Sequence, residues 1–387
     1  MSEFKLLPRL LRVIEIGAAV WGLVAFVYYW DPTRAIVKRL MVESPYLYEE
    51  IHPRFLKVPV NELITVRTRA DIMARRQLLV DVIWGGRQFS GAGTPVAISP
   101  NLLIEERRSN CLLEGDDEIF FSPIECKLDG YREFKNLSRI ARLEIPVETN
   151  YRSVVALFLP MKSNGRVVLY HHGYAGTYHE QYRHLEKMIE RGFTVVALNL
   201  PGYGDNIKAD RSGPLPKSGL ETARWVLEPV IVSLNYISSQ MNPLHISMIG
   251  FSAGGWVTTL AAALDARIRS SYIVASPFPL EFRDTPVSGP QISRIRELVE
   301  VANLYDIFIM GSSGDEIGQR QQMHIYNQFD RCCWNNRVAR IFELPVKEAV
   351  ESLGGEFLVK IDRSHARHKV SHQAFSLILE KLNGGNN

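Results

Sequence analysis

Residues 246–264 read ISMIGFSAGGWVTTLAAAL and join a short apolar run, a glycine-flanked serine and a helical pattern of small residues. The serine is Ser252, in the motif Gly250-Phe251-Ser252-Ala253-Gly254. Glycines on both sides of a serine permit a sharp strand-to-helix turn that exposes the hydroxyl group. The stretch therefore predicts a nucleophilic serine at the carboxyl end of a strand, and the alternative is a serine that merely caps the helix.

Apolar runs alternate with helical patterns on both sides of this motif. The runs lie at 166–170, 194–198, 246–249, 271–275, 306–310 and 357–361, after a strand pair at 142–147 and 153–159. Helical patterns occupy 180–191, 219–239 and 254–264. This alternation predicts an α/β fold with a mostly parallel central sheet and helices on both faces. Ligands of such sheets bind at the carboxyl ends of the strands, so the loops after the runs should carry the chemistry.

Those loops contain a carboxylate and histidines in addition to the serine. Asp315 follows the run at 306–310, and His365 follows the run at 357–361. A serine hydroxyl needs a base to remove its proton, histidine titrates near neutrality, and a carboxylate orients the imidazole. The order Ser252, Asp315, His365 therefore predicts a catalytic triad.

The identity of the base is open among three histidines. His365 lies nearest the end of its strand and is favoured for that reason. His368 is the alternative base, and His372 falls in a predicted helix. Asp315 and His365 are 50 positions apart, and residues 332–351 between them resemble an insertion.

From Arg142 to the C-terminus the chain resembles the α/β-hydrolase superfamily, and most of all its esterase, lipase and serine-aminopeptidase-like branches. The matching segments are His172-Gly173, residues 200–204 (LPGYG), the Ser252 motif, residues 311–315 and His365. The resemblance implies that Ser252 is the nucleophile, Asp315 the acid and His365 the base. It also implies an oxyanion hole made by the backbone N–H groups of Tyr174 and Ala253.

The predicted organisation has three parts, at 1–40, 41–140 and 141–387. Residues 13–30 (VIEIGAAVWGLVAFVYYW) predict an apolar helix at the short end of the membrane-spanning range. This helix is either a membrane anchor or a segment that packs on the body, so the location is membrane-associated or cytoplasmic. Residues 41–140 are an extension of uncertain fold, a candidate lid or partner contact, with a helical pattern at 68–83. The hydrolase domain occupies 141–387.

Charge and cysteine content indicate which partners and cofactors to expect. The chain has 387 residues, a formal charge of +3 and no long basic run, so nucleic acid is not expected as a partner. The four cysteines lack metal-ligand spacing, and no metal or organic cofactor is required. The leading function is hydrolysis of a carboxylic ester with an acyl or lipid-like substrate. The alternatives are an acyltransferase with the same acyl-enzyme and a non-catalytic membrane- or partner-binding module. The oligomeric state is not indicated.

Overall fold

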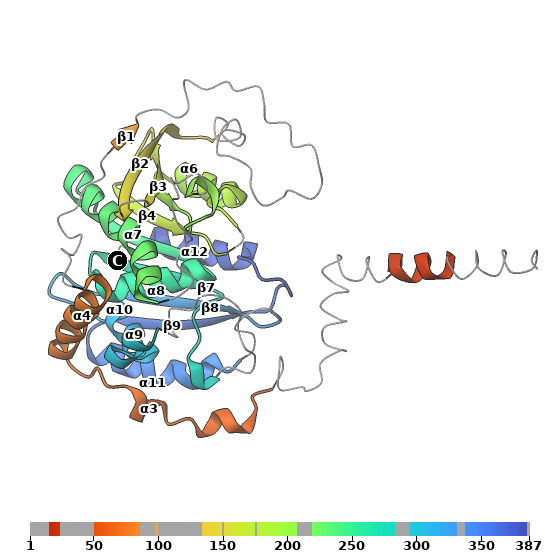
Figure 1. Ribbon diagram of the computed structural model, residues 1–387, viewed down its shortest axis with the longest axis vertical. Helices are drawn as coiled ribbons and strands as arrows, with labels where there is room; N and C mark the ends of the chain where they lie inside the picture. The colour runs from red at the N-terminus through yellow and green to blue at the C-terminus, as the bar shows by residue number, and fades with distance from the viewer. Residues whose placement is uncertain are drawn as a thin grey trace, which may run out of the picture.

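The computed structural model describes residues 15–23, 50–85, 97–99, 134–148, 151–174, 176–206, 219–282, 295–330 and 337–384. Within them, one nine-stranded sheet runs through the molecule with helices packed on both faces (Figure 1). The predicted α/β class and mostly parallel sheet are confirmed.

The strand order places the antiparallel strands at one side of the sheet and the parallel ones at the other. In spatial order the strands are β1 (Ala97–Ser99), β2 (Leu137–Glu148), β3 (Tyr151–Pro160), β5 (Thr194–Leu198), β4 (Arg166–His171), β6 (His245–Phe251), β7 (Ile268–Val274), β8 (Gln321–Asn327) and β9 (Glu356–Asp362). Pairs from β1 to β5 are antiparallel, and pairs from β5 to β9 are parallel. The carboxyl ends of six neighbouring strands therefore meet at one edge of the sheet.

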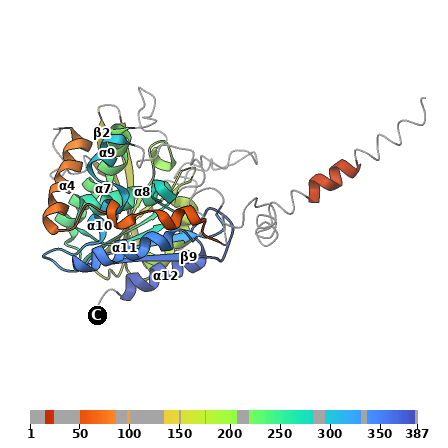
Figure 2. The same cartoon turned by 90° about the horizontal axis from the view of Figure 1, so that it is seen from below.

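Helices cover the two faces unequally. One face carries α4 (Arg69–Trp84), α7 (Leu220–Met241), α8 (Ala253–Leu264), α9 (Arg296–Val301), α10 (Leu304–Ser312) and α11 (Ala339–Ser352). The other face carries α6 (Tyr182–Glu190) and α12 (His372–Gly384), and Figure 2 shows α12 on the side away from α7 and α10. Alternate side chains of a strand enter opposite cores, as Leu169 and Tyr170 of β4 do. Both faces of the sheet are thus buried beneath the edge where the strands end.

The apolar run at 306–310 forms a helix, and the prediction of a strand there is wrong. The run lies in α10, whose residues from Tyr305 to Ser312 are all buried. A helix that is buried on all sides shows no polar face, so its periodicity resembles that of a buried strand. The strand at this place in the sheet is β8, and α11 is the crossover helix that parallel β8 and β9 require. The described part of the predicted insertion at 332–351, from residue 337 onward, therefore belongs to an ordinary strand–helix–strand unit.

The predicted helix at 68–83 is confirmed as α4. Thr68 and Asp71 form a capping box at its start, and Gly85 ends it with a φ of 59°. Before it lie the short helices η3 (Pro53–Lys57) and α3 (Val60–Leu63). Phe55, Ile64 and Leu79 of this region belong to the core that also contains α7 and α8. Residues 50–85 therefore pack against the body of the hydrolase fold.

The apolar stretch at 13–30 is described only over residues 15–23, which are helical and exposed. In the parts of the chain that the structure describes, no helix is long and apolar enough to cross a membrane. Residues 13–14 and 24–30 of the predicted anchor lie outside the described residues.

Candidate active site

Ser252 occupies a strained turn between β6 and α8. Its φ of 54° and ψ of −119° lie outside the regions that residues with side chains usually adopt. A Cβ at Gly250 would lie 2.2 Å from Thr258 Oγ1, and a Cβ at Gly254 would lie 2.3 Å from the His171 carbonyl oxygen. Glycine is thus required at both positions because neighbouring atoms approach the backbone too closely for a side chain.

His368 is the histidine that reaches this serine. Its Nε2 lies 2.8 Å from Ser252 Oγ, and its Nδ1 lies 2.5 Å from Asp330 Oδ2. His368 belongs to the loop between β9 and α12, and Asp330 follows the end of β8. The Asp330 side chain is only 1% exposed, whereas that of His368 is 23% exposed. A serine, an imidazole and a buried carboxylate therefore stand in hydrogen-bond sequence at the carboxyl edge of the sheet.

His365, the predicted base, points elsewhere. Its Nδ1 accepts a hydrogen bond from the Arg367 N–H at 3.2 Å, and its Nε2 lies 3.5 Å from Asp362 Oδ2. Because Nδ1 accepts, the proton of a neutral His365 resides on Nε2 and faces Asp362. The structure thus brings the alternative base His368, and not His365, to Ser252.

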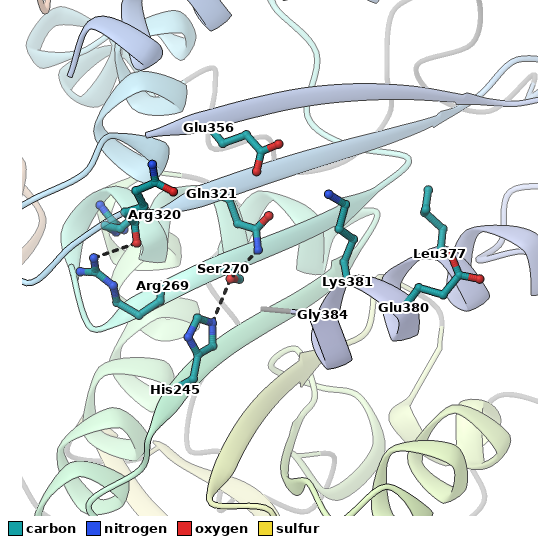
Figure 3. Close-up of a pocket in the computed structure, with 11 residues that line it drawn as sticks. His245, Arg269, Ser270, Arg320, Gln321, Glu356, Leu377, Glu380, Lys381 and Gly384 are labelled. Carbon is teal, nitrogen blue, oxygen red and sulfur yellow. Dashed lines mark hydrogen bonds between the residues drawn. The ribbon is translucent and has the colours of Figure 1, made fainter. Parts of the chain in front are cut away.

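Asp315, the predicted acid, lies near the opposite edge of the sheet. Its Oδ2 accepts from Arg269 Nη1 at 2.6 Å. Arg269 lies at the start of β7 and lines a polar groove of about 470 Å³ (Figure 3). Burial raises the pKa of the Asp315 carboxyl, but hydrogen bonding and charge from Arg269 outweigh burial and lower it overall. The geometry makes Asp315 an ion-pair partner of Arg269, remote from His368.

Asp330 is the residue that sequence reasoning missed. It follows β8, which contains Gln321, Gln322, His324 and Asn327 and so lacks a continuous apolar run. One signal was present in the sequence: the helical pattern of α11 immediately before the last strand. A parallel sheet needs a strand before such a crossover helix, and the loop after that strand contains Asp330.

The two predicted oxyanion donors flank Ser252. A Cβ at Gly173 would lie 2.7 Å from Ser252 Cβ, so the backbone just before Tyr174 passes close to the serine. Ala253 is the first residue of α8, and the N–H of a first helical residue has no acceptor within its helix. The side chain of Tyr174 is half-exposed and contacts the ring of Tyr203, with centroids 6.0 Å apart.

Two buried histidines precede this loop. Burial lowers the pKa of His171 and of His172 to about 4, and the charge of His368 also lowers that of His172. Both imidazoles are therefore neutral near pH 7. The His172 ring contacts Phe251 at 5.4 Å, and Phe251 contacts His368 at 4.8 Å between centroids.

Comparison with known proteins supports the α/β fold described above. A family model described as the alpha/beta hydrolase fold matches residues 166–297. The match spans 132 of the 387 residues, and over this part the chain is similar to the α/β-hydrolase superfamily. The match contains β4 to α8 and therefore the Ser252 turn, whereas the loops of Asp330 and His368 lie beyond it.

Two solved structures are similar over most of the chain. The methylesterase BT1017 has a TM-score of 0.56 at 13% identity, over 83% of this chain and 65% of the methylesterase chain. An acetyl xylan esterase from Paenibacillus sp. R4 has a TM-score of 0.54 at 14% identity, over 84% and 98% of the two chains. At these identities the likeness establishes the fold. Comparison with curated protein sequences finds no match.

Proposed function

We propose that this chain hydrolyses a carboxylic ester through an acyl-enzyme on Ser252, with His368 as the base and Asp330 as the acid that orients it. The observation that carries the proposal is the pair of contacts of His368, 2.8 Å to Ser252 Oγ and 2.5 Å to Asp330 Oδ2. These are the contacts by which a serine nucleophile is activated. The proposal replaces His365 and Asp315, the triad members favoured by sequence position, with His368 and Asp330.

The order of proton transfers follows from this geometry. His368 Nε2 accepts the proton of Ser252 Oγ as that oxygen bonds to the ester carbonyl carbon. The negative charge that develops on the carbonyl oxygen accepts hydrogen bonds from the N–H groups of Tyr174 and Ala253. The C–O bond to the alcohol then breaks, and the alcohol oxygen takes the proton from His368. Water repeats the sequence on the acyl-enzyme and releases the acid and free Ser252.

Asp330 contributes by fixing one tautomer of the base. Its carboxylate accepts a hydrogen bond from the Nδ1–H of His368, which leaves the Nε2 lone pair directed at Ser252. The same carboxylate stabilises the imidazolium that exists between the two proton transfers. Because the Asp330 side chain is buried, water screens this interaction only weakly.

Ester cleavage is also the activity named for both similar structures, a methylesterase and an acetyl xylan esterase. Their names support an ester as the substrate class for this chain. They leave the acyl and alcohol parts open, so the first assay should use a panel of nitrophenyl esters of increasing acyl length.

The test compares Ser252→Ala with Ser239→Ala in that assay. Ser239 is an exposed serine of α7 whose Oγ donates to the Tyr236 carbonyl oxygen, so its removal serves as a matched control. We expect Ser252→Ala to lower kcat by roughly 10⁴-fold or more, since triad members act as a unit, and Ser239→Ala to leave it unchanged. Substantial turnover by Ser252→Ala would refute the proposal. Product analysis with added primary alcohol should still give mainly the free acid, as expected for a hydrolase.

A further inference from the structure

The loop that carries Tyr174 is tied to a neighbouring turn by a buried polar cluster. The loop connects β4 to α6, and the turn at 199–206 follows β5 and ends in η6 (Gly204–Asn206). Tyr178 and His179 belong to the loop, and Asn199 and Asp205 belong to the turn. These four residues are named the loop anchor below.

Asp205 is the centre of the loop anchor. Its Oδ2 accepts from the Tyr178 hydroxyl at 2.5 Å, and its Oδ1 lies 3.3 Å from His179 Nε2. The side chains of Asp205 and His179 are each 2% exposed. The Tyr178 N–H donates to Asn199 Oδ1 at 3.1 Å. One carboxylate thus holds two successive loop residues, and an amide from the same turn holds the backbone N–H of the first of them.

The turn is itself fixed to the sheet. Asn206 Nδ2 donates to the Asn199 carbonyl oxygen at 2.8 Å, and Asn206 Oδ1 accepts from the Val154 N–H of β3 at 2.7 Å. Gly204 has a φ of +54°, and a Cβ there would lie 2.3 Å from Asn199 Nδ2. The loop anchor therefore fixes the loop relative to the sheet.

The loop is also held at its other end. β4 ends at His171, and Gly173 lies against Ser252 so closely that a side chain there would clash. The proposed oxyanion donor, the N–H of Tyr174, lies between this contact and Tyr178. An oxyanion donor acts only when it lies about 2.7–3.1 Å from the oxygen that develops charge. Small movements of Tyr178 and His179 would therefore change the strength of that hydrogen bond.

We propose that Asp205, through Tyr178 and His179, is a positioning residue that sets the Tyr174 amide at the oxyanion. The inference rests on the proposed ester hydrolysis. A buried carboxylate is costly unless it is fully hydrogen-bonded, and apolar packing stabilises a fold at lower cost. We therefore assign the loop anchor the role of holding the loop that contains Tyr174 in one position.

The experiment measures steady-state kinetics and inhibition by an aryl boronic acid, which forms a tetrahedral adduct on the nucleophile. The variants are Tyr178→Phe, which deletes one hydroxyl, and Asp205→Asn, which keeps the shape of the carboxylate. The matched control is Tyr272→Phe, because Tyr272 is equally buried and its hydroxyl accepts from Gln321 Nε2 on neighbouring β8.

We expect both loop-anchor variants to lower kcat by roughly 10- to 100-fold, less than the loss of a whole oxyanion donor. KM should change by less than about two-fold, and boronate affinity should fall in the same ratio as kcat, because the lost contact acts on the tetrahedral state. Tyr272→Phe should change neither kcat nor boronate affinity.

Either folded variant could have a lowered melting temperature but unchanged kcat and boronate affinity. That result would show that the loop anchor is only structural. It would overturn this inference but leave the proposed ester hydrolysis standing. Asp205→Asn supplies this comparison even where Tyr178→Phe fails to fold. A folded wild type that neither hydrolyses esters nor reacts at Ser252 would overturn the proposed function and the inference together.

Discussion

The hydroxyl of Ser252, the proposed nucleophile, is positioned by backbone that has little freedom to move. The Ser252 N–H donates to the Val274 carbonyl oxygen at 2.9 Å, and its own carbonyl oxygen accepts from the N–H of Gly255 at 2.9 Å. Gly173 and Gly254 allow the preceding loop to pass directly over it. Strain of this kind persists only where the surroundings over-determine a residue, and it is concentrated at functional sites.

Exchange of the carboxylate at position 330 tests the revised acid. Asp330→Asn should lower kcat by roughly 10³- to 10⁴-fold, because an amide that donates to Nδ1 stabilises the wrong tautomer of His368. Asp315→Asn is the matched control and should leave kcat nearly unchanged, since Asp315 pairs with Arg269. Ester turnover and melting temperature would be measured for both. A large fall in kcat for Asp315→Asn but not for Asp330→Asn would instead support Asp315 as the acid.

At the residue scale, the sequence predicted the surroundings of the nucleophile better than its partners. Ser252, Tyr174 and Ala253 lie together, because one short local motif and one adjacent loop place them. The choice of His365 rested on distance from the strand end. In the structure Asp362 accepts from the Ser364 N–H and hydroxyl, which turns the chain so that His365 faces inward and His368 faces Ser252. The hydrogen bonds of Asp362 with Ser364 form only in the folded loop, so the sequence alone does not predict them.

The loop from β9 to α12 is the element that presents His368, and Asp362 holds both of its ends. Asp362 Oδ1 accepts from Ser364, and Asp362 Oδ2 accepts from the Ser371 hydroxyl at 2.5 Å. The Ser371 Oγ accepts in turn from the Ala374 N–H at 2.9 Å, near the start of α12. Burial raises the pKa of Asp362, but hydrogen bonds from His365, Ser371 and Ser364 outweigh burial and hold that pKa well below its ordinary value.

A depressed pKa predicts a specific pH dependence of stability. The folded-state pKa of Asp362 lies below its unfolded-state value of about 4, so its contribution is complete above that pH and is lost as the pH falls below it. Asp362→Asn should therefore lower the free energy of unfolding near pH 7 and lose less stability than wild type as the pH falls from about 4 to 2. Urea unfolding at several pH values measures both. Parallel acid profiles for the two proteins would contradict this account.

At the element scale, the helix α10 explains why the sequence points to Asp315 and not to Asp330 as the acid. Its sequence LYDIFIMGS is apolar and short, so no periodicity distinguishes it from a buried strand. Asn303 caps it through a hydrogen bond to the Asp306 N–H, and this short polar cap was the local sign of a helix. A strand at 306–310 would place Asp315 in the loop after it, whereas the strand of the structure is β8, and Asp330 follows it.

At the scale of the whole molecule, the region before the hydrolase strands is part of the same packed body. Asp306 of α10 accepts from the N–H groups of Thr65 and Val66 at 2.8 and 2.9 Å and from the Thr65 hydroxyl at 2.6 Å. Arg76 of α4 donates to the Ala263 carbonyl oxygen at the end of α8. The sequence predicted the helix α4 but not its partners, because the helical pattern does not reveal which surface it covers.

Removal of the Asp306 carboxylate should weaken the packing of residues 50–85 against α10. Asp306→Ala leaves the buried N–H of Val66 without its acceptor and removes the part-buried contacts to Thr65. An unsatisfied buried group costs roughly 1–3 kcal/mol, so the free energy of unfolding should fall by about that amount or more. Asp81→Ala, on the exposed side of α4, removes a carboxylate that accepts from Gln77 Nε2 at 2.8 Å and should change stability by less than about 0.5 kcal/mol. Chemical denaturation measures both. Equal stabilities would show that residues 50–85 are held mainly by apolar packing.

The most direct test of the central claim is active-site labelling with a fluorophosphonate, followed by peptide mass spectrometry. The account predicts a single adduct on Ser252 in wild type and in His365→Ala, and almost none in His368→Ala. Loss of the adduct in His365→Ala, with full labelling of His368→Ala, would contradict the assignment of the base.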